Sequence, residues 1–139
     1  MIYIGTIRDI SNKYHENWLI VRSAKSVPKY SKQITDLSPS VSLFQSYLHS
    51  KKNGLWNKTW FLDNYVPQFL HEIKHNPNAI SLLGELYQDS FTKDIILCCY
   101  CPDETLCHRS IIAGLLLGAD ANISCNKNYI SYWHKFISP

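Results

Sequence analysis

Arginine is scarce in this chain of 139 residues, with three arginines against eleven lysines. Charged residues make up only 18% of the sequence, while hydrophobic residues make up 45%. This balance is typical of a folded globular protein and excludes an intrinsically disordered one. The net charge of +3 favours anionic partners weakly, and it excludes the dense basic stripe of a protein that coats DNA.

A long hydrophobic run is also missing. No stretch reaches the roughly eighteen apolar residues of a membrane span, and the first residues lack the basic and apolar regions of a signal peptide. We therefore expect a soluble, cytoplasmic protein without a membrane partner. Because the chain is short and shows no repeat or long linker, we expect residues 1–139 to form a single domain.

The five cysteines are an odd number, and four of them lie between Cys98 and Cys107. If Cys98 and Cys99 belong to a strand, their side chains point to opposite faces. That arrangement suits a disulfide framework poorly, so free thiols in a reducing compartment are the better interpretation.

Residues 94–118 form the most informative segment. The apolar run Ile95 to Cys99 predicts a strand that is covered on both faces, as in a parallel sheet. A short polar loop follows, and then Cys107, His108 and Arg109 open an apolar helix. Arg109 opposes the dipole of that helix, so an anion, or a carboxylate such as Asp103 or Glu104, is expected to hold it there.

The remaining pattern predicts strands over residues 2–7 and 18–22, an ordered loop over 23–40, and a short last strand over 121–125. Helices are predicted over residues 41–49, 57–75, 78–87 and 129–137, with Ser40 and Asn78 as caps and Pro67 either bending the second helix or splitting it in two. Trp56, Trp60, Tyr65 and Phe69 are read as core, although Trp56 or Tyr30 could instead stack on a base. This order of elements predicts an α/β layer fold with a mainly parallel sheet.

Each of the three arginines lies at or just past the end of a predicted strand, or at the start of the helix that follows one. If those strands are parallel, Arg8, Arg22 and Arg109 reach one edge of the sheet, where open α/β folds bind ligands. Arginine suits two-pronged recognition of phosphate or carboxylate. The candidate ligand-binding residues are therefore Thr6, Arg8, Arg22, Ser23, Tyr100 and Arg109.

The segment from Ile96 to Ser110, with its cysteine-rich loop and Cys107, His108 and Arg109, resembles the domain-of-unknown-function 488 family. The first strand and the Val21, Arg22, Ser23 step are also similar to that family. The sequence departs from the family pattern at Ile20, where the family usually has Asp, and in the loop, where the family's frequent Glu is either replaced by Cys101 or displaced to Glu104. The resemblance implies a three-layer Rossmann-like fold and a site, but no particular reaction.

Three other chemistries are compatible with parts of the sequence. Cys101 or Cys107 could act as a catalytic nucleophile with His108 as acid or base, although the phosphatase spacing of Cys, five residues and Arg is absent. Zinc on Cys99, Cys101, Cys107 and His108 is disfavoured because paired Cys-x2-Cys knuckles are missing, and we predict neither a metal nor a cofactor. His71, Glu72 and His75 match a metalloprotease pattern, but Asn76 and Pro77 end the helix directly after it.

These observations favour a protein that binds a phosphorylated, nucleotide-like ligand at the carboxyl edge of the sheet. It could be an enzyme that acts on nucleotides or nucleic-acid bases. The alternative is a non-catalytic binding protein of phage type, which sequesters a nucleotide immune signal or inhibits a partner protein. Nucleic acid and a second copy of the chain stay open as partners.

Overall fold

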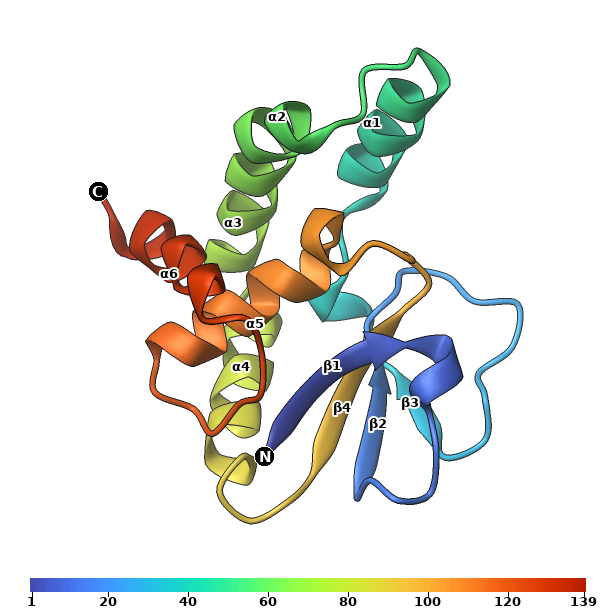
Figure 1. The fold of residues 1–139 in the computed structure, drawn as a ribbon, viewed down its shortest axis with the longest axis vertical. Helices are drawn as coiled ribbons and strands as arrows, with labels where there is room; N and C mark the ends of the chain where they lie inside the picture. The colour runs from blue at the N-terminus through green and yellow to red at the C-terminus, as the bar shows by residue number, and fades with distance from the viewer.

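A computed structural model describes all residues, 1–139, which form an α/β fold with helices on both faces of a central sheet (Figure 1). The sheet has four parallel strands in the order β1-β4-β2-β3. The strands are β1 (Ile2–Thr6), β2 (Glu16–Leu19), β3 (Ser31–Gln33) and β4 (Ile95–Cys99). The helices are α1 (Val41–Lys52), α2 (Lys58–Trp60), α3 (Val66–Lys74), α4 (Pro77–Asp89), α5 (His108–Gly118) and α6 (Ile130–Ile137). The prediction of a three-layer, Rossmann-like fold with a parallel sheet is confirmed.

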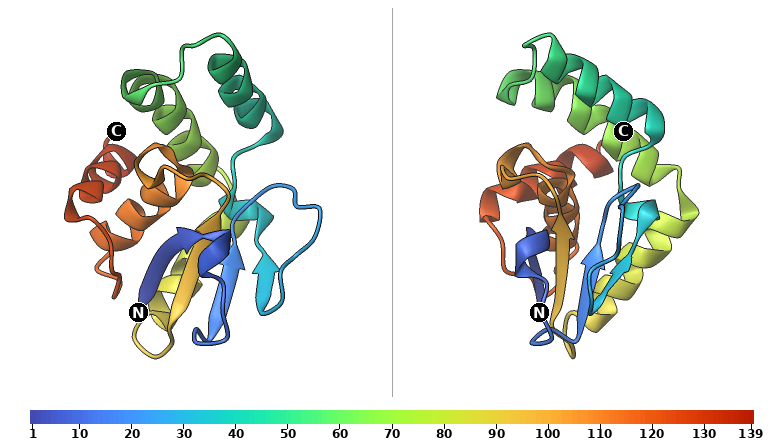
Figure 2. Two further views of the ribbon diagram at one scale, coloured as in Figure 1. Left: turned by 45° about the vertical axis from the view of Figure 1, so that its right-hand side comes forward. Right: turned by 90° about the vertical axis from the view of Figure 1, so that its right-hand side faces the viewer.

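Strand β4 lies between β1 and β2, and all five of its residues are buried. In the right-hand view of Figure 2, α5 and α6 lie on one side of the sheet and α4 lies on the other. A strand that is covered on both faces has no position for a polar side chain, which explains the continuous apolar run. The strand–loop–helix unit expected over residues 94–118 is confirmed as β4 and α5, and the strand expected over residues 2–7 is confirmed as β1, which ends one residue earlier, at Thr6.

Two glycines let α6 pack closely against α5. A Cβ atom at Gly114 would lie 2.1 Å from the carbonyl oxygen of Tyr129, and one at Gly118 would lie 1.9 Å from Cγ of Trp133. These distances are far below van der Waals contact, so any larger residue would push the terminal helix away. The predicted helix at the C-terminus is confirmed, and it covers α5 at its carboxyl half.

Helices α1 to α3 extend beyond the carboxyl ends of the strands (Figure 1). Ser40 caps α1 as expected, because its Oγ accepts a hydrogen bond from the Leu43 N–H at 3.1 Å. A π-helical turn, Phe61–Tyr65, joins α2 to α3 and leads directly to Pro67 in the first turn of α3. The helix therefore continues past Pro67, since the wide turn accommodates a residue that has no N–H to donate.

Several local predictions were wrong. The loop over residues 23–40 contains the short edge strand β3, all three residues of which pair with β2. Residues 121–125 form a single bridge between Ile123 and Ile2 and no strand. Asn76, and not Asn78, caps α4 by accepting bonds from the Asn78 and Ala79 N–H groups.

The spacing of Ile80, Leu83 and Tyr87 predicts that these residues form the inward face of α4. Ile80 and Tyr87 are exposed, whereas Ala79 and Leu86 are buried. The buried residues each lie one position before a predicted one, which corresponds to about 100° around the helix. None of the helices is both long and apolar enough to cross a lipid bilayer.

Candidate functional site

A cavity of about 480 Å³ opens at the carboxyl edge of the sheet, between the ends of β2 and β4 and the overlying helix α1. Most of its lining is hydrophobic or aromatic. The residues that line it are Val21, Arg22, Ser23, Pro39, Val41, Phe44, Gln45, Tyr47, Leu48, Trp56, Tyr65, Cys99, Tyr100, Cys101, Leu106, Cys107 and His108. The cavity lies where parallel α/β sheets place their ligands.

The floor of this cavity is a cluster of three cysteine thiols. Cys99 ends β4, Cys101 lies in the loop, and Cys107 precedes the first residue of α5. Their three sulfur atoms all lie within 4.8 Å of one another, and the Cys99 and Cys107 sulfurs are 2.8 Å apart. The tertiary structure therefore brings together cysteines whose spacing in the sequence resembles no standard metal motif.

Arg109 lies beneath the thiol cluster and is only 2% exposed. Its Nη1 donates hydrogen bonds to Cys99 Sγ and to the Cys101 carbonyl oxygen, both at 2.8 Å, and contacts Cys107 Sγ at 3.3 Å. Its Nε has no partner, and none of the four ion pairs of the chain includes Arg109. A buried guanidinium with sulfur and carbonyl contacts, but without a carboxylate, is unusual.

The expected carboxylate partners of Arg109 are used elsewhere. Asp103 accepts hydrogen bonds from the backbone N–H and hydroxyl of Thr105. Glu104 accepts a hydrogen bond from the Tyr129 hydroxyl at 2.6 Å. Asp103 therefore stabilises the turn of its own loop, and Glu104 binds the C-terminal segment. Neither carboxylate pairs with Arg109, which contacts the thiols instead.

His108 is buried beside the thiols but is fixed by the backbone. Its Nε2 donates a hydrogen bond to the Ile20 carbonyl oxygen at 2.6 Å, so Nδ1 carries the lone pair and faces Cys107 Sγ at 3.7 Å. Burial lowers the pKa of His108 to about 4, against the smaller opposing effect of that hydrogen bond. His108 is therefore neutral at physiological pH.

The thiols themselves are protonated at neutral pH. Burial raises the pKa of Cys107 to about 12. At Cys99 the hydrogen bond with Cys101 lowers the pKa, but contact with Cys107 and burial outweigh it and raise the pKa to about 11. Because the thiolate is the nucleophile, these groups are not activated in the absence of a ligand or metal.

Helix α1 and the segment after it form an aromatic wall. Tyr47 and Trp56 meet edge to face with ring centres 4.6 Å apart, and Trp56 also contacts Tyr65. Burial raises the pKa of Tyr47; the hydrogen bond from Lys51 Nζ opposes this rise and the neighbouring Cys101 adds to it. The Tyr47 hydroxyl therefore lies between the exposed Lys51 and the thiol floor.

Arg22 and Ser23 lie at the rim of the cavity. Arg22 Nε donates a hydrogen bond to the Pro39 carbonyl oxygen at 2.6 Å, while its two terminal nitrogens make no hydrogen bond within the protein. A second, more open hollow of about 580 Å³ adjoins this rim and is lined by Ile7, Ser23, Ala24, Lys25, Ser26 and Tyr100. Ser23 and Tyr100 line both hollows, so the two spaces form adjoining parts of one site.

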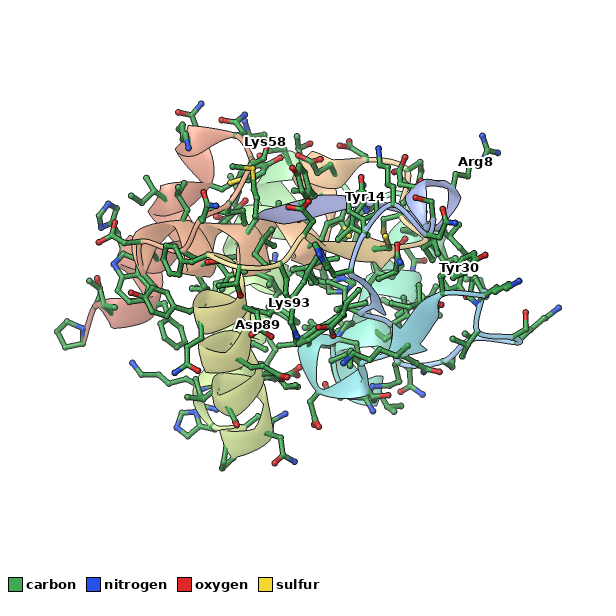
Figure 3. The ribbon with its side chains drawn as sticks, turned by 90° about the horizontal axis from the view of Figure 1, so that it is seen from below. Arg8, Tyr14, Tyr30, Lys58, Asp89 and Lys93 are labelled. Carbon is green, nitrogen blue, oxygen red and sulfur yellow. The ribbon has the colours of Figure 1, made fainter.

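The three arginines share an edge of the sheet, but their side chains do not converge. Arg8 follows β1 and projects into solvent, as Figure 3 shows. Thr6 caps the turn of Arg8 and Asp9 and is absent from the lining of either hollow. Arg22 alone lines the cavity, since Arg109 is buried below its floor.

The metalloprotease pattern forms no metal site. His71 and His75 are exposed, and their rings lie tilted against each other with centres 4.3 Å apart. Glu72 accepts hydrogen bonds from the backbone N–H and the hydroxyl of Ser40, so it joins α3 to the start of α1. This contact holds one wall of the cavity in place.

The sequence interpretation missed most of the aromatic wall. It read Trp56 mainly as core, and it gave Val41, Phe44 and Leu48 no role, although all of them line the cavity. The feature that could have revealed them is the number of large hydrophobic side chains on α1, because the structure buries only Leu43 and Ser50 of this helix. An exposed apolar face of this kind indicates either a ligand pocket or an interface.

A family model described as the active DUF488-N3 subclade, DUF488-N3a, matches residues 3–120. No curated protein and no solved structure matches the chain. The matched region contains all four strands apart from Ile2, together with the thiol floor, the aromatic wall and the rim arginine. The chain belongs to the DUF488-N3a family.

Proposed function

We propose that the edge site binds a nucleotide-like ligand, with the base in the aromatic cavity and the phosphate in the adjoining open hollow. The observation that carries the proposal is the pairing of two unlike spaces across Ser23 and Tyr100. One is walled by aromatic side chains, and the other carries Lys25 and serine hydroxyls. A nucleotide combines the same two chemistries in one molecule.

The aromatic wall suits a flat heterocycle. Trp56 and Tyr47 offer ring faces and edges on α1 and the segment after it, while Phe44 and Leu48 supply apolar contact. Stacking of a base on such side chains contributes roughly 1–3 kcal/mol per base. The cavity volume of about 480 Å³ lies within the range of small-molecule sites, roughly 300–1,000 Å³.

The rim suits an anion. The terminal nitrogens of Arg22 have no protein partner, and its Nε bond to Pro39 fixes the plane of the guanidinium. A fixed fork with free donors favours two-pronged contact with phosphate. Lys25 in the open hollow adds positive charge without fixed geometry.

Binding without turnover is better supported than acid–base catalysis by the residues of the floor. His108 is neutral and its Nε2 is already engaged, and Cys107 is protonated. These properties support capture of a cytoplasmic nucleotide, including sequestration of a nucleotide immune signal by a phage-type protein. The alternative is catalysis by Cys101, Cys107 and His108. It requires that the bound ligand activate the thiols, which are protonated in the free protein.

A panel of nucleotides and cyclic nucleotides, read by thermal shift, tests binding. We expect Arg22→Ala to weaken binding of phosphorylated members by about tenfold or more, as loss of a charged hydrogen bond of about 1.5–3 kcal/mol implies. Arg8→Ala is the matched control, because it removes an exposed arginine at the same edge that lines neither hollow. Equal effects of the two substitutions, or no shift with any nucleotide, would contradict the proposal.

Turnover is measured in the same samples by mass spectrometry of the ligand. An unchanged ligand after prolonged incubation supports capture. A consumed ligand, with consumption abolished by Cys101→Ser, supports the enzyme instead. Nucleosides without phosphate separate the two halves of the site, because they should bind Arg22→Ala and the unchanged protein equally.

A further inference from the structure

We propose that Cys99, Cys101 and Cys107 form a binding site for one thiophilic divalent cation, represented by zinc, with a fourth coordination position open to the cavity. The three ligands come from the end of β4, the loop after it and the residue before α5. All three side chains line the cavity, so a bound ion would be reached from its interior. The proposal is independent of which organic ligand the cavity binds.

The distances between the sulfur atoms suit one ion. Zinc–thiolate bonds of about 2.3 Å in a tetrahedron place two sulfurs roughly 3.8 Å apart. The three sulfurs here lie within 4.8 Å of one another, and the shortest pair, Cys99 and Cys107, would have to separate by about 1 Å. Cys101 lies in a loop without regular structure, so it can adjust to complete the trigonal face.

The buried guanidinium is the second, independent observation. Arg109 is 2% exposed, its Nε has no partner, and it has no carboxylate in contact. A divalent cation on three thiolates leaves one net negative charge, which the single positive charge of Arg109 would balance. Each thiol gives up its proton to solvent when the metal–sulfur bond forms, so charge and atoms balance without a redox step.

The contacts of Arg109 also have the form expected of an outer-shell partner. Its Nη1 donates to Cys99 Sγ and contacts Cys107 Sγ, while the same nitrogen bonds the Cys101 carbonyl oxygen. Donors of this kind orient ligand atoms and moderate their charge. The Nη1 atom of Arg109 therefore contacts all three proposed ligand residues and fixes their positions relative to one another.

The type and number of ligands define the ion and its role. Soft thiolates select zinc, cobalt or cadmium over magnesium and calcium, which require oxygen ligands. Structural zinc sites are closed by four protein ligands, whereas sites with three protein ligands keep an exchangeable position. His108 lies outside the group of side chains whose ligand atoms fall within 4.8 Å of one another, and its Nε2 is held by the Ile20 carbonyl oxygen, so the three thiols are the ligands of this site.

Cobalt titration of the untagged, reduced whole protein tests the site without any nucleotide. We expect one equivalent of cobalt to bind, with a thiolate-to-cobalt charge-transfer band and the intense visible bands of tetrahedral cobalt. One equivalent of zinc should displace the cobalt. Metal analysis of protein purified without chelator should find bound zinc, at up to one ion per chain. Absence of the charge-transfer band in folded, reduced protein would overturn the proposal.

Matched cysteine variants separate a site from general thiol binding. Cys101→Ser changes a half-buried loop residue and should abolish the charge-transfer band of stoichiometric cobalt. Cys98→Ser is the control on the same strand, outside the cluster, and should keep it. If circular dichroism shows both variants folded and both lose cobalt equally, the assignment of the ligands is wrong.

Two further variants test the charge argument and separate it from nucleotide binding. Arg109→Met should weaken zinc binding by about 10–100-fold, as expected for loss of an outer-shell partner. Arg22→Ala should leave the cobalt spectrum unchanged, because Arg22 contacts none of the three sulfurs. Unchanged zinc affinity in folded Arg109→Met, or a cobalt spectrum lost in Arg22→Ala, would contradict the proposal, whatever the nucleotide panel shows.

Discussion

The two edges of the sheet use charged residues in opposite ways. Around the amino ends of the strands, Glu16 pairs with Lys32 and Lys93, Lys93 also pairs with Asp89, and Met1 pairs with Asp94. Figure 3 shows Asp89 and Lys93 close together on this side of the molecule. At the carboxyl edge, Arg22 and Arg109 have no carboxylate partner. The charged groups at the amino edge therefore pair with one another, whereas the guanidinium groups at the carboxyl edge have N–H donors without a carboxylate partner.

This difference indicates where each edge contributes. Partly exposed ion pairs such as those of Glu16 contribute little to the free energy of unfolding, because water and salt screen them. A buried cation without a counter-charge costs free energy unless something else stabilises it. The carboxyl edge therefore bears a cost in the free protein that a bound anion or metal–thiolate cluster would relieve.

The largest expected effect is at Arg109. Arg109→Ala should lower the free energy of unfolding by about 3–4 kcal/mol, because it leaves a cavity and removes the hydrogen bond to the Cys101 carbonyl oxygen. Arg109→Met should cost clearly less, since it fills the space without a charge to desolvate. Urea unfolding of the reduced, metal-free proteins measures both. A loss in Arg109→Ala no larger than that in Glu16→Gln would break the contrast between the edges.

His108 should make stability sensitive to mild acid. Its pKa is about 4 in the folded protein and about 6.5 when unfolded, so the unfolded state binds the proton first. Stability is complete above pH 6.5 and should fall by on the order of 3 kcal/mol as the pH drops toward 4. Urea unfolding across this range measures the loss. His108→Gln, which keeps a side-chain N–H for Ile20, should abolish this slope; an unchanged slope would assign it to other groups.

Thiol reactivity should follow burial at the carboxyl edge. In reduced protein with chelator, iodoacetamide should modify Cys101 and Cys125 first, because both are only partly buried. Cys99, with a pKa near 11, has about a hundredfold less thiolate than an ordinary thiol, and Cys107 and Cys98 have less still. Peptide mass mapping gives the order. Labelling of Cys107 before Cys125 would show that the floor is more open, or its thiol more acidic, than the structure indicates.

The smallest expected effect is at the amino edge. Burial raises the pKa of Glu16, but hydrogen bonds from Trp18, Lys32 and Lys93 outweigh it and lower the pKa to about 2. The stabilisation is therefore present above pH 4.5 and lost as the pH falls toward 2. Because Glu16 and its lysine partners are partly exposed, water and salt screen these ion pairs, and Glu16→Gln should cost less than about 1 kcal/mol at neutral pH, by urea unfolding. A larger cost, insensitive to salt, would mean that this edge also carries a buried charge network.

The sequence allowed good prediction of elements whose pattern is local. Ile95 to Cys99 is apolar throughout, and Ser40 precedes the periodic residues of α1, so both elements were found. It failed at β3, where Ser31, Lys32 and Gln33 carry no strand signal and pair only because β2 offers an edge. It also misplaced the cap of α4 by two residues, since Asn76 and Asn78 are both good caps.

The sequence by itself determined the parallel α/β architecture, the strand–loop–helix unit that ends in Cys107, His108 and Arg109, and the resemblance to the family. These follow from periodicity, caps and residue type, which act over a few neighbouring positions. Only the tertiary structure decided that Arg109 turns inward, that three sulfurs meet, and that α1 lends its apolar face to a cavity. Side-chain direction depends on packing between distant segments, and that information is spread over the whole chain.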